Sequence, residues 1–167
     1  MSAKEVFLKT YDEEHGRTMR LLRAFPADKL ETRPSPKLKT ARELAWVFVI
    51  ERGLGTKLWN DEFAKGVPAG GSPPPPAPQN WNDLLSAIEK AHKDFAQMVR
   101  KASDDDLQKK THFLVGPKKM GEMTRMDVLW FLLHDEIHHR GQFSIYQRIA
   151  GGKVPSIYGP TADEQWF

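Results

Sequence analysis

The 167-residue chain is 40% hydrophobic and 28% charged, a composition typical of a globular domain with a substantial core. Its 25 basic and 22 acidic residues leave a formal net charge of +3, too small and scattered an excess to indicate nucleic-acid binding, and the absence of cysteine excludes disulfides and a cysteine nucleophile. The charged start and the lack of an apolar run of about 18 residues predict a cytoplasmic protein that does not enter membranes.

The first predicted helix spans about Ala3 to Ala24, and Phe25-Pro26 is expected to end it because proline disfavours helical geometry in the residue before it. His15 lies on its apolar face, where a histidine is either a hydrogen-bonded core residue or a ligand. The other residues of that face recur at helical spacing and are Val6, Phe7, Tyr11, Thr18, Met19 and Leu22.

The second predicted helix begins with a capping box at Thr40–Glu43 and continues to about Phe63. Glu51 falls on its apolar line, and a carboxylate there either turns toward solvent or finds a partner inside the protein. The other members of that line are Leu44, Val47, Phe48 and Leu58.

A proline-rich link follows at about 65–79. Its four consecutive prolines predict an extended surface spacer, and a ligand for a proline-binding partner is the alternative. A third helix is predicted from Asn80 or Asn82 to about Ser103, with His92 at its rim or surface.

The segment after the third helix is the least regular. Asp104-Asp105-Asp106 is expected to be a solvated turn. Residues 111–115 fit either a short strand or an extended crossover that ends at Gly116-Pro117.

The last predicted helix, Thr124 to Ala150, starts with a capping box and stops at Gly151-Gly152. It is apolar on several sides, so we expect it to be buried at the centre of the protein. These elements predict an all-α fold, a four-helix bundle with long crossover links that forms one domain over 1–167. The tail, residues 151–167, is expected to pack back on the bundle through Ile157, Tyr158, Trp166 and Phe167.

Polar residues interrupt the middle of this last helix, where HDEIHH at 134–139 holds three histidines and two acids. Asp135, His138 and His139 share one helix face, and His134 pairs with His138 at a spacing that lets two imidazoles reach one ion. Imidazole and carboxylate ligands together suit zinc, nickel, manganese or iron(II).

The apolar lines of a bundle converge, which would bring His15 and Glu51 to face this polar run. The candidate metal ligands are then His15, Glu51, Asp135 and His139, with His134 and His138 as alternates. A buried hydrogen-bond network without a metal stays open as the alternative.

Several neighbours have expected supporting roles. Arg140 should bond to an acid or a carbonyl, and Gly141 should allow close approach of another helix. Gln142 should support a ligand or a buried carboxylate, and Tyr158 should cap the pocket or simply pack.

Three segments resemble the DinB superfamily of four-helix-bundle proteins: HHRGQFSIYQRIAGGKVPSIYGP at 138–160, TARELAWVFVIE at 40–51, and the AFP that ends the first helix. The resemblance implies a DinB-like fold, usually a homodimer, and often a divalent metal held by three histidines. Some relatives are thiol-dependent transferases or isomerases that use bacillithiol, mycothiol or glutathione, and many others have no assigned activity.

Two of the three ligand positions of that family differ here. The first is Val47, the second is Asp135, and only His139 matches. Aspartate is a competent ligand, and Glu51, one turn after Val47, is in a position to replace the missing imidazole. We therefore expect a divalent-metal-dependent hydrolase or thiol-dependent transferase acting on a small molecule, with Glu51 as ligand or general base. The alternative is a metal-free dimeric binding or stress-response module.

Overall fold

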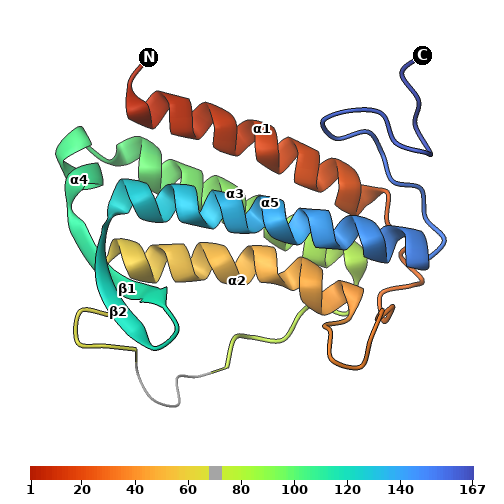
Figure 1. Ribbon diagram of the computed structural model, residues 1–167, viewed down its shortest axis with the longest axis horizontal. Helices are drawn as coiled ribbons and strands as arrows, with labels where there is room; N and C mark the ends of the chain where they lie inside the picture. The colour runs from red at the N-terminus through yellow and green to blue at the C-terminus, as the bar shows by residue number, and fades with distance from the viewer. Residues whose placement is uncertain (68–72) are drawn as a thin grey trace.

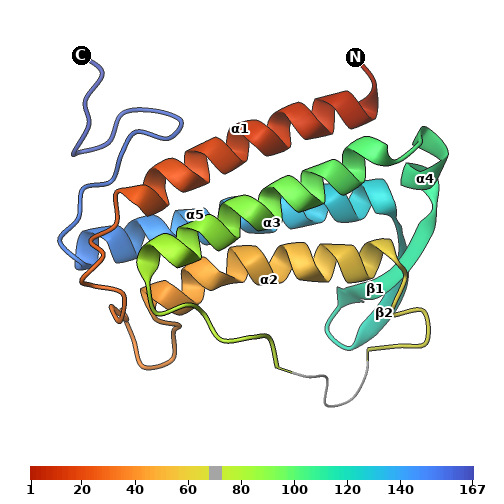
Figure 2. The ribbon, with the colours of Figure 1, turned by 180° about the vertical axis from the view of Figure 1, so that it is seen from behind.

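Four long helices run side by side along one axis in the structure, a computed structural model that describes residues 1–67 and 73–167 (Figure 1). α1 and α5 run in one direction while α2 and α3 run in the other, so a crossover along the bundle must join α2 to α3 (Figures 1 and 2). The predicted bundle of four long helices is confirmed. These helices are α1 (Ala3–Arg23), α2 (Ala41–Trp59), α3 (Trp81–Lys101) and α5 (Arg125–Ile149).

The helix starts follow the capping residues in the sequence. At α1, α2 and α5 the side chain of Ser2, Thr40 or Thr124 accepts a hydrogen bond from the backbone N–H three residues later. The acidic side chain at that third position accepts a bond from the cap residue's own N–H in return. The boxes predicted at Thr40 and Thr124 are therefore confirmed.

α2 ends at Trp59, so its predicted continuation to Phe63 is wrong. Asp61 adopts a left-handed backbone conformation with φ of 53°, which aspartate tolerates better than most residues and which breaks the helix. Its carboxylate accepts hydrogen bonds from the Thr111 side chain and the His112 backbone, and these bonds tie the end of α2 to the next strand.

Between α3 and α5 the chain forms a short helix, α4 (Asp104–Gln108), and an antiparallel hairpin of β1 (Lys110–Gly116) and β2 (Lys119–Thr124). The strand interpretation of residues 111–115 is confirmed. Asp104 and Asp105 are exposed as predicted, but residues 104–106 begin the short helix α4, capped by Ser103, and do not form a turn. The second strand was not predicted, since its sequence, KMGEMT, has no alternating apolar pattern.

The apolar core is divided into two clusters. One gathers around Phe48 and Phe143, and the other around Phe7 and Leu133. In the sequence of every long helix, buried polar residues fall between the residues of the two clusters. We call this set the polar layer; it comprises Glu14, Thr18, Glu51, Arg52, His92, Glu136 and Arg140.

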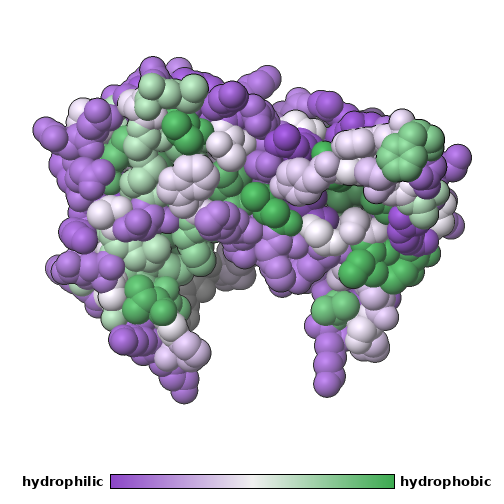
Figure 3. Space-filling view, turned by 45° about the horizontal axis from the view of Figure 1, so that its top comes forward, coloured by the Kyte–Doolittle hydropathy of each residue, from purple (hydrophilic) through white to green (hydrophobic). Residues whose placement is uncertain are grey.

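The surface departs from the sequence prediction at both ends of the chain. Val6 is 41% exposed, so its assignment to the buried face of α1 is wrong. The tail packs back through Val154 and Ser156 and, as predicted, through the partly buried Ile157. Contrary to expectation, most of Tyr158, Trp166 and Phe167 is exposed. The face in Figure 3 is mainly hydrophilic, with separate hydrophobic patches. Within the described ranges, every helix is too short or too polar to cross a bilayer.

Candidate metal centre

Glu51 of α2 meets Asp135 and His139 of α5 at the level of the polar layer. One ligand atom from each residue lies within 4.8 Å of the other two. His139 Nε2 is 3.4 Å from Glu51 Oε1 and 3.7 Å from Asp135 Oδ1. Asp135 and His139 are four residues apart and so share one face of α5. The structure brings together three of the four predicted ligands, and we call them the triad.

Gln142 orients the imidazole of the triad. Its Oε1 lies 3.0 Å from His139 Nδ1, and its Nε2 lies 2.9 Å from His138 Nε2. With the amide in this orientation, Gln142 Nε2 donates to His138 Nε2 and Oε1 accepts from His139 Nδ1–H. Neutral His139 in this tautomer would direct the lone pair of Nε2 at the two carboxylates, as a metal ligand requires.

The triad therefore presents acceptor atoms to one another, and its electrostatics suit a cation. Both carboxylate oxygens of Glu51 are buried and have no hydrogen-bond partner within 1–67 and 73–167. Burial raises the pKa of Glu51 to about 9; Arg52 opposes the rise and the Asp135 charge adds to it. A divalent cation would supply the missing positive charge, and one imidazole with two carboxylates is a donor set that such ions accept.

The triad is open on one side. The side chains of Asp135 and His139 are 37% and 22% exposed, whereas that of Glu51 is 7% exposed. The site is therefore accessible to solvent at Asp135 and His139, while Glu51 lies at its inner end.

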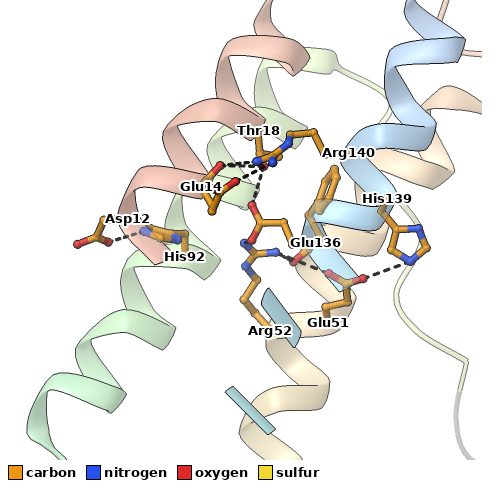
Figure 4. Close-up of polar contacts among 10 residues, drawn as sticks. Asp12, Glu14, Thr18, Glu51, Arg52, His92, Glu136, His139 and Arg140 are labelled. Atoms are coloured by element: carbon orange, nitrogen blue, oxygen red, sulfur yellow. Dashed lines mark hydrogen bonds and ion pairs between the residues drawn. The ribbon is translucent and has the colours of Figure 1, made fainter. Parts of the chain in front are cut away.

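Arg52 links Glu51 to the rest of the polar layer (Figure 4). Its guanidinium donates to Glu136 Oε2 at 2.5 Å and lies 3.9 Å from Glu51 Oε2. Glu136 also accepts a hydrogen bond from Thr18 Oγ1 at 2.7 Å. In Figure 4 Arg52 lies between the two glutamates, with His139 beyond Glu51. The inner wall of the site is thus built from α1, α2 and α5 together.

Arg140 and Glu14 form a second buried ion pair at 2.6 Å, which confirms that Arg140 bonds to an acid. Tyr158 from the tail donates a hydrogen bond to Glu14 Oε2 at 2.5 Å. Burial alone would raise the pKa of Glu14, but the hydrogen bonds from Tyr158 and Arg140 lower it. Tyr158 therefore covers this ion pair and not the triad.

His15 lies apart from the triad and faces α3. Its ring stacks on that of His92, with the centroids 3.7 Å apart. His92 is only 6% exposed, so its prediction as a rim or surface residue is wrong; its Nε2 bonds to Asp12 Oδ1 at 2.9 Å. Burial, and then the neighbouring His92, lower the pKa of His15 to about 3. Both rings act as neutral packing groups between α1 and α3.

The two alternate ligands also lie outside the triad. His134 and His138 are exposed on the outer side of α5. Four residues around the triad were not predicted as site residues: Arg52, Glu136, Glu14 and Thr18. One signal was present: Glu136 and Arg140 stand one turn apart on an apolar helix, where an acid and a base both need buried partners.

Comparisons with known proteins agree on one family. A family model with the description "DinB family" matches residues 1–166. The uncharacterized protein YrdA of Bacillus subtilis (strain 168) is 31% identical over 161 residues, which cover 96% of this chain and 90% of YrdA.

Solved structures show the same fold. A DinB-like protein from Bacillus cereus ATCC 10987 superposes with a TM-score of 0.75 at 23% identity, over 92% of this chain and 97% of that one. The DinB-like protein YjoA from Bacillus subtilis gives a TM-score of 0.66 at 15% identity, over 95% of this chain and 98% of that one. At such identities the likeness concerns the fold.

Proposed function

The chain belongs to the DinB family, and on that premise we propose that the triad holds one divalent metal ion in a metal-dependent enzyme. The proposed activity is that of a hydrolase or a thiol-dependent transferase acting on a small molecule. The observation that carries the proposal is the meeting of Glu51, Asp135 and His139, which point acceptor atoms at one another within 4.8 Å.

Each residue of the site has a separate task in this proposal. When bound, a zinc, manganese, iron(II) or nickel ion would lower the pKa of water or of a thiol and so supply a nucleophile near neutral pH. The chain has no cysteine, so the nucleophile comes from solvent or from the substrate. Gln142 holds the His139 lone pair toward the site, and Arg52 anchors the helix turn that carries Glu51.

Metal binding tests the proposal directly. Protein purified without a metal-affinity tag and supplied with zinc, manganese or nickel should bind one ion per chain, measured by elemental analysis and calorimetry. Gln142→Ala should weaken binding by about 10- to 100-fold, because partners that orient a ligand typically contribute that much. His139→Ala removes a ligand and should weaken binding further.

His134→Ala is the matched control, since His134 lies on the same helix but is exposed and outside the triad. It should bind the ion nearly as tightly as the unmodified protein. Absence of a stoichiometric ion, or equal losses in His134→Ala and His139→Ala, would rule out the triad as the metal site.

A metal-free dimeric binding or stress-response module is the second candidate. It is favoured by the pairing of Arg52 with Glu136 and of Arg140 with Glu14, since these charges need no ion. Adding a chelator distinguishes these two candidate functions. The melting temperature of a metal enzyme should fall, because an ion bound to the native state adds stability, whereas that of a metal-free bundle should not change.

We also propose that the protein is a homodimer, as the DinB resemblance implies, with the outer face of α5 as the contact. Phe131, Ile145 and Ile149 are 42%, 59% and 54% exposed on that helix. Gly141 lies between them, and a Cβ added there would meet no atom within 4 Å, which leaves room for a second helix. Light scattering should give twice the chain mass for the unmodified protein and the chain mass for Ile145→Glu.

A further inference from the structure

A small cavity among buried residues shares Glu51 with the triad. Its volume is about 10 Å³, close to the roughly 10–15 Å³ that one water molecule requires. Neither Asp135 nor His139 contributes to its wall. The residues that line it are all buried and are Tyr11, Glu51, Arg52, Phe95, Leu132 and Glu136.

Three of these lining residues carry polar atoms without a partner. Tyr11 Oη, Arg52 Nε and both carboxylate oxygens of Glu51 make no hydrogen bond to any residue of 1–67 or 73–167. Tyr11, Glu51 and Arg52 are 3%, 5% and 6% exposed, so bulk water does not satisfy these atoms either. Buried polar groups are nearly always bonded, and unbonded atoms on three residues around one cavity indicate a common partner.

We propose that this cavity is a binding site for one ordered water molecule that joins Tyr11 and Arg52 to Glu51. The hydrogen-bonding capacity of water matches the wall. Its two lone pairs accept from Tyr11 O–H and Arg52 Nε–H, and one of its protons is donated to Glu51 Oε2. Its second proton faces Glu136, whose carboxylate has lone pairs beyond those used by Arg52 and Thr18.

The same wall excludes a second metal ion in this position. A cation could not accept the hydrogen bonds of Tyr11 and Arg52, and the charge of Arg52 would repel it. The two oxygens of Glu51 thereby have different tasks. Oε1 lies 3.4 Å from His139 Nε2 and faces the triad, whereas Oε2 is the oxygen nearer Arg52 and faces the water.

Tyr11 is then a positioning residue for Glu51, and this part of the inference rests on the proposed metal function. The phenol fixes the water, the water fixes one oxygen of Glu51, and the other oxygen is held toward the ion. Burial raises the pKa of Tyr11 to about 12, so the phenol keeps its proton and remains a donor.

A high-resolution crystal structure of the metal-free protein tests the water site independently of any metal. One water peak should lie within hydrogen-bond distance of Tyr11 Oη, Arg52 Nε and Glu51. In Tyr11→Phe the peak should be lost or displaced, because one of its donors is gone. A cavity that is empty in the unmodified protein, or closed by a direct bond between Tyr11 and Glu51, overturns the proposal.

Metal affinity tests the positioning role. Tyr11→Phe should bind the ion about tenfold more weakly than the unmodified protein, the lower end of the effect of partners outside the ligand set. Tyr146→Phe is the control, because it removes the same hydroxyl from another helix position, where the group donates to Lys39 O at 2.9 Å. Its metal affinity should not change.

The outcomes of the two experiments are distinct. If the unmodified protein binds no ion, the proposed function fails while the crystal structure still decides the water site. If the water is seen but Tyr11→Phe binds the ion as tightly as the unmodified protein, Tyr11 has no positioning role.

Discussion

Arg52 compensates the charge of buried carboxylates in the polar layer. It is 6% exposed and lies between two buried carboxylates, 2.5 Å from Glu136 and 3.9 Å from Glu51. Removing one member of a buried ion pair is costly because the other charge is left without compensation.

Arg52→Met should lower the free energy of unfolding by about 3–5 kcal/mol, measured by urea denaturation. Adding Glu136→Gln should restore a large part of that loss, because the unpaired carboxylate is then removed. If the double variant is no more stable than Arg52→Met, the lost stability does not come from the Arg52–Glu136 pair.

The stacked histidines predict an acid-sensitive stability. Burial holds the pKa of His15 near 3 and also lowers that of His92, whereas unfolded histidine titrates near 6.5. Below pH 6.5 the unfolded chain binds more protons at these two positions than the native one, so their contribution to stability falls as pH falls. The slope from His15 should approach about 1.4 kcal/mol per pH unit, and His92 contributes in the same direction.

Urea denaturation between about pH 7 and pH 5 compares this slope in the unmodified protein and in His15→Phe, which keeps the stacking on His92. The two slopes should differ by up to about 1.4 kcal/mol per pH unit, the contribution of one neutral histidine. Glu51, whose pKa burial raises to about 9, and His112, whose pKa the bond to Asp61 raises, act in the opposite sense but equally in both proteins. An unchanged slope in His15→Phe would contradict a neutral His15.

The sequence indicated the residues of the triad but not their surroundings. Glu51, Asp135 and His139 stand out because each is a polar residue on or beside an apolar line of its helix. The pairing of Arg52 with Glu136 and the turning of His15 toward His92 depend on how each helix is rotated about its axis. Helical spacing does not determine that rotation, so these contacts could not be predicted.

Two glycines on α2 differ in how closely other helices approach them. A Cβ added to Gly55 would lie 2.7 Å from Leu132 Cδ1 and 2.7 Å from Phe95 Cε2, whereas one added to Gly53 would meet no atom within 4 Å. Gly55 thus allows α2 to approach α3 and α5 closely.

Gly55→Ala should lower the melting temperature and cost about 1–3 kcal/mol, because the packed side chains must move. Gly53→Ala is the matched control on the same helix and should raise stability by about 0.5–1 kcal/mol through helix propensity. Thermal unfolding followed by circular dichroism compares the two variants. Equal effects would mean that Gly55 is not at a close contact.

Element starts were more predictable than element ends and strands. Capping boxes are local and short, and Thr40 and Thr124 show them in the sequence. The end of α2 depends on Asp61 and its bonds to a strand about 50 residues later. β2 exists because β1 pairs with it, and this tertiary cause leaves little trace in the sequence KMGEMT.

The polar layer draws residues from all four long helices, so an ion in the triad should act on the whole molecule. We expect saturating metal to slow hydrogen exchange by a similar factor in the protected amides of α1, α2, α3 and α5, because those amides exchange through global unfolding. Amides of the tail should not change, since exposed segments open locally. Mass spectrometry after exchange measures both. Protection confined to the turns around Glu51 and His139 would contradict this coupling.

The position of the polar layer between two apolar clusters also affects how the four long helices align along their axes. Helices with a uniformly apolar core can shift along their axes by one turn and still bury their leucines. Here such a shift would separate Arg52 from Glu136 and Arg140 from Glu14, and would leave four unpaired charges in the apolar core. We therefore expect these ion pairs to specify a single register of the helices, the register in which Glu51 lies opposite His139.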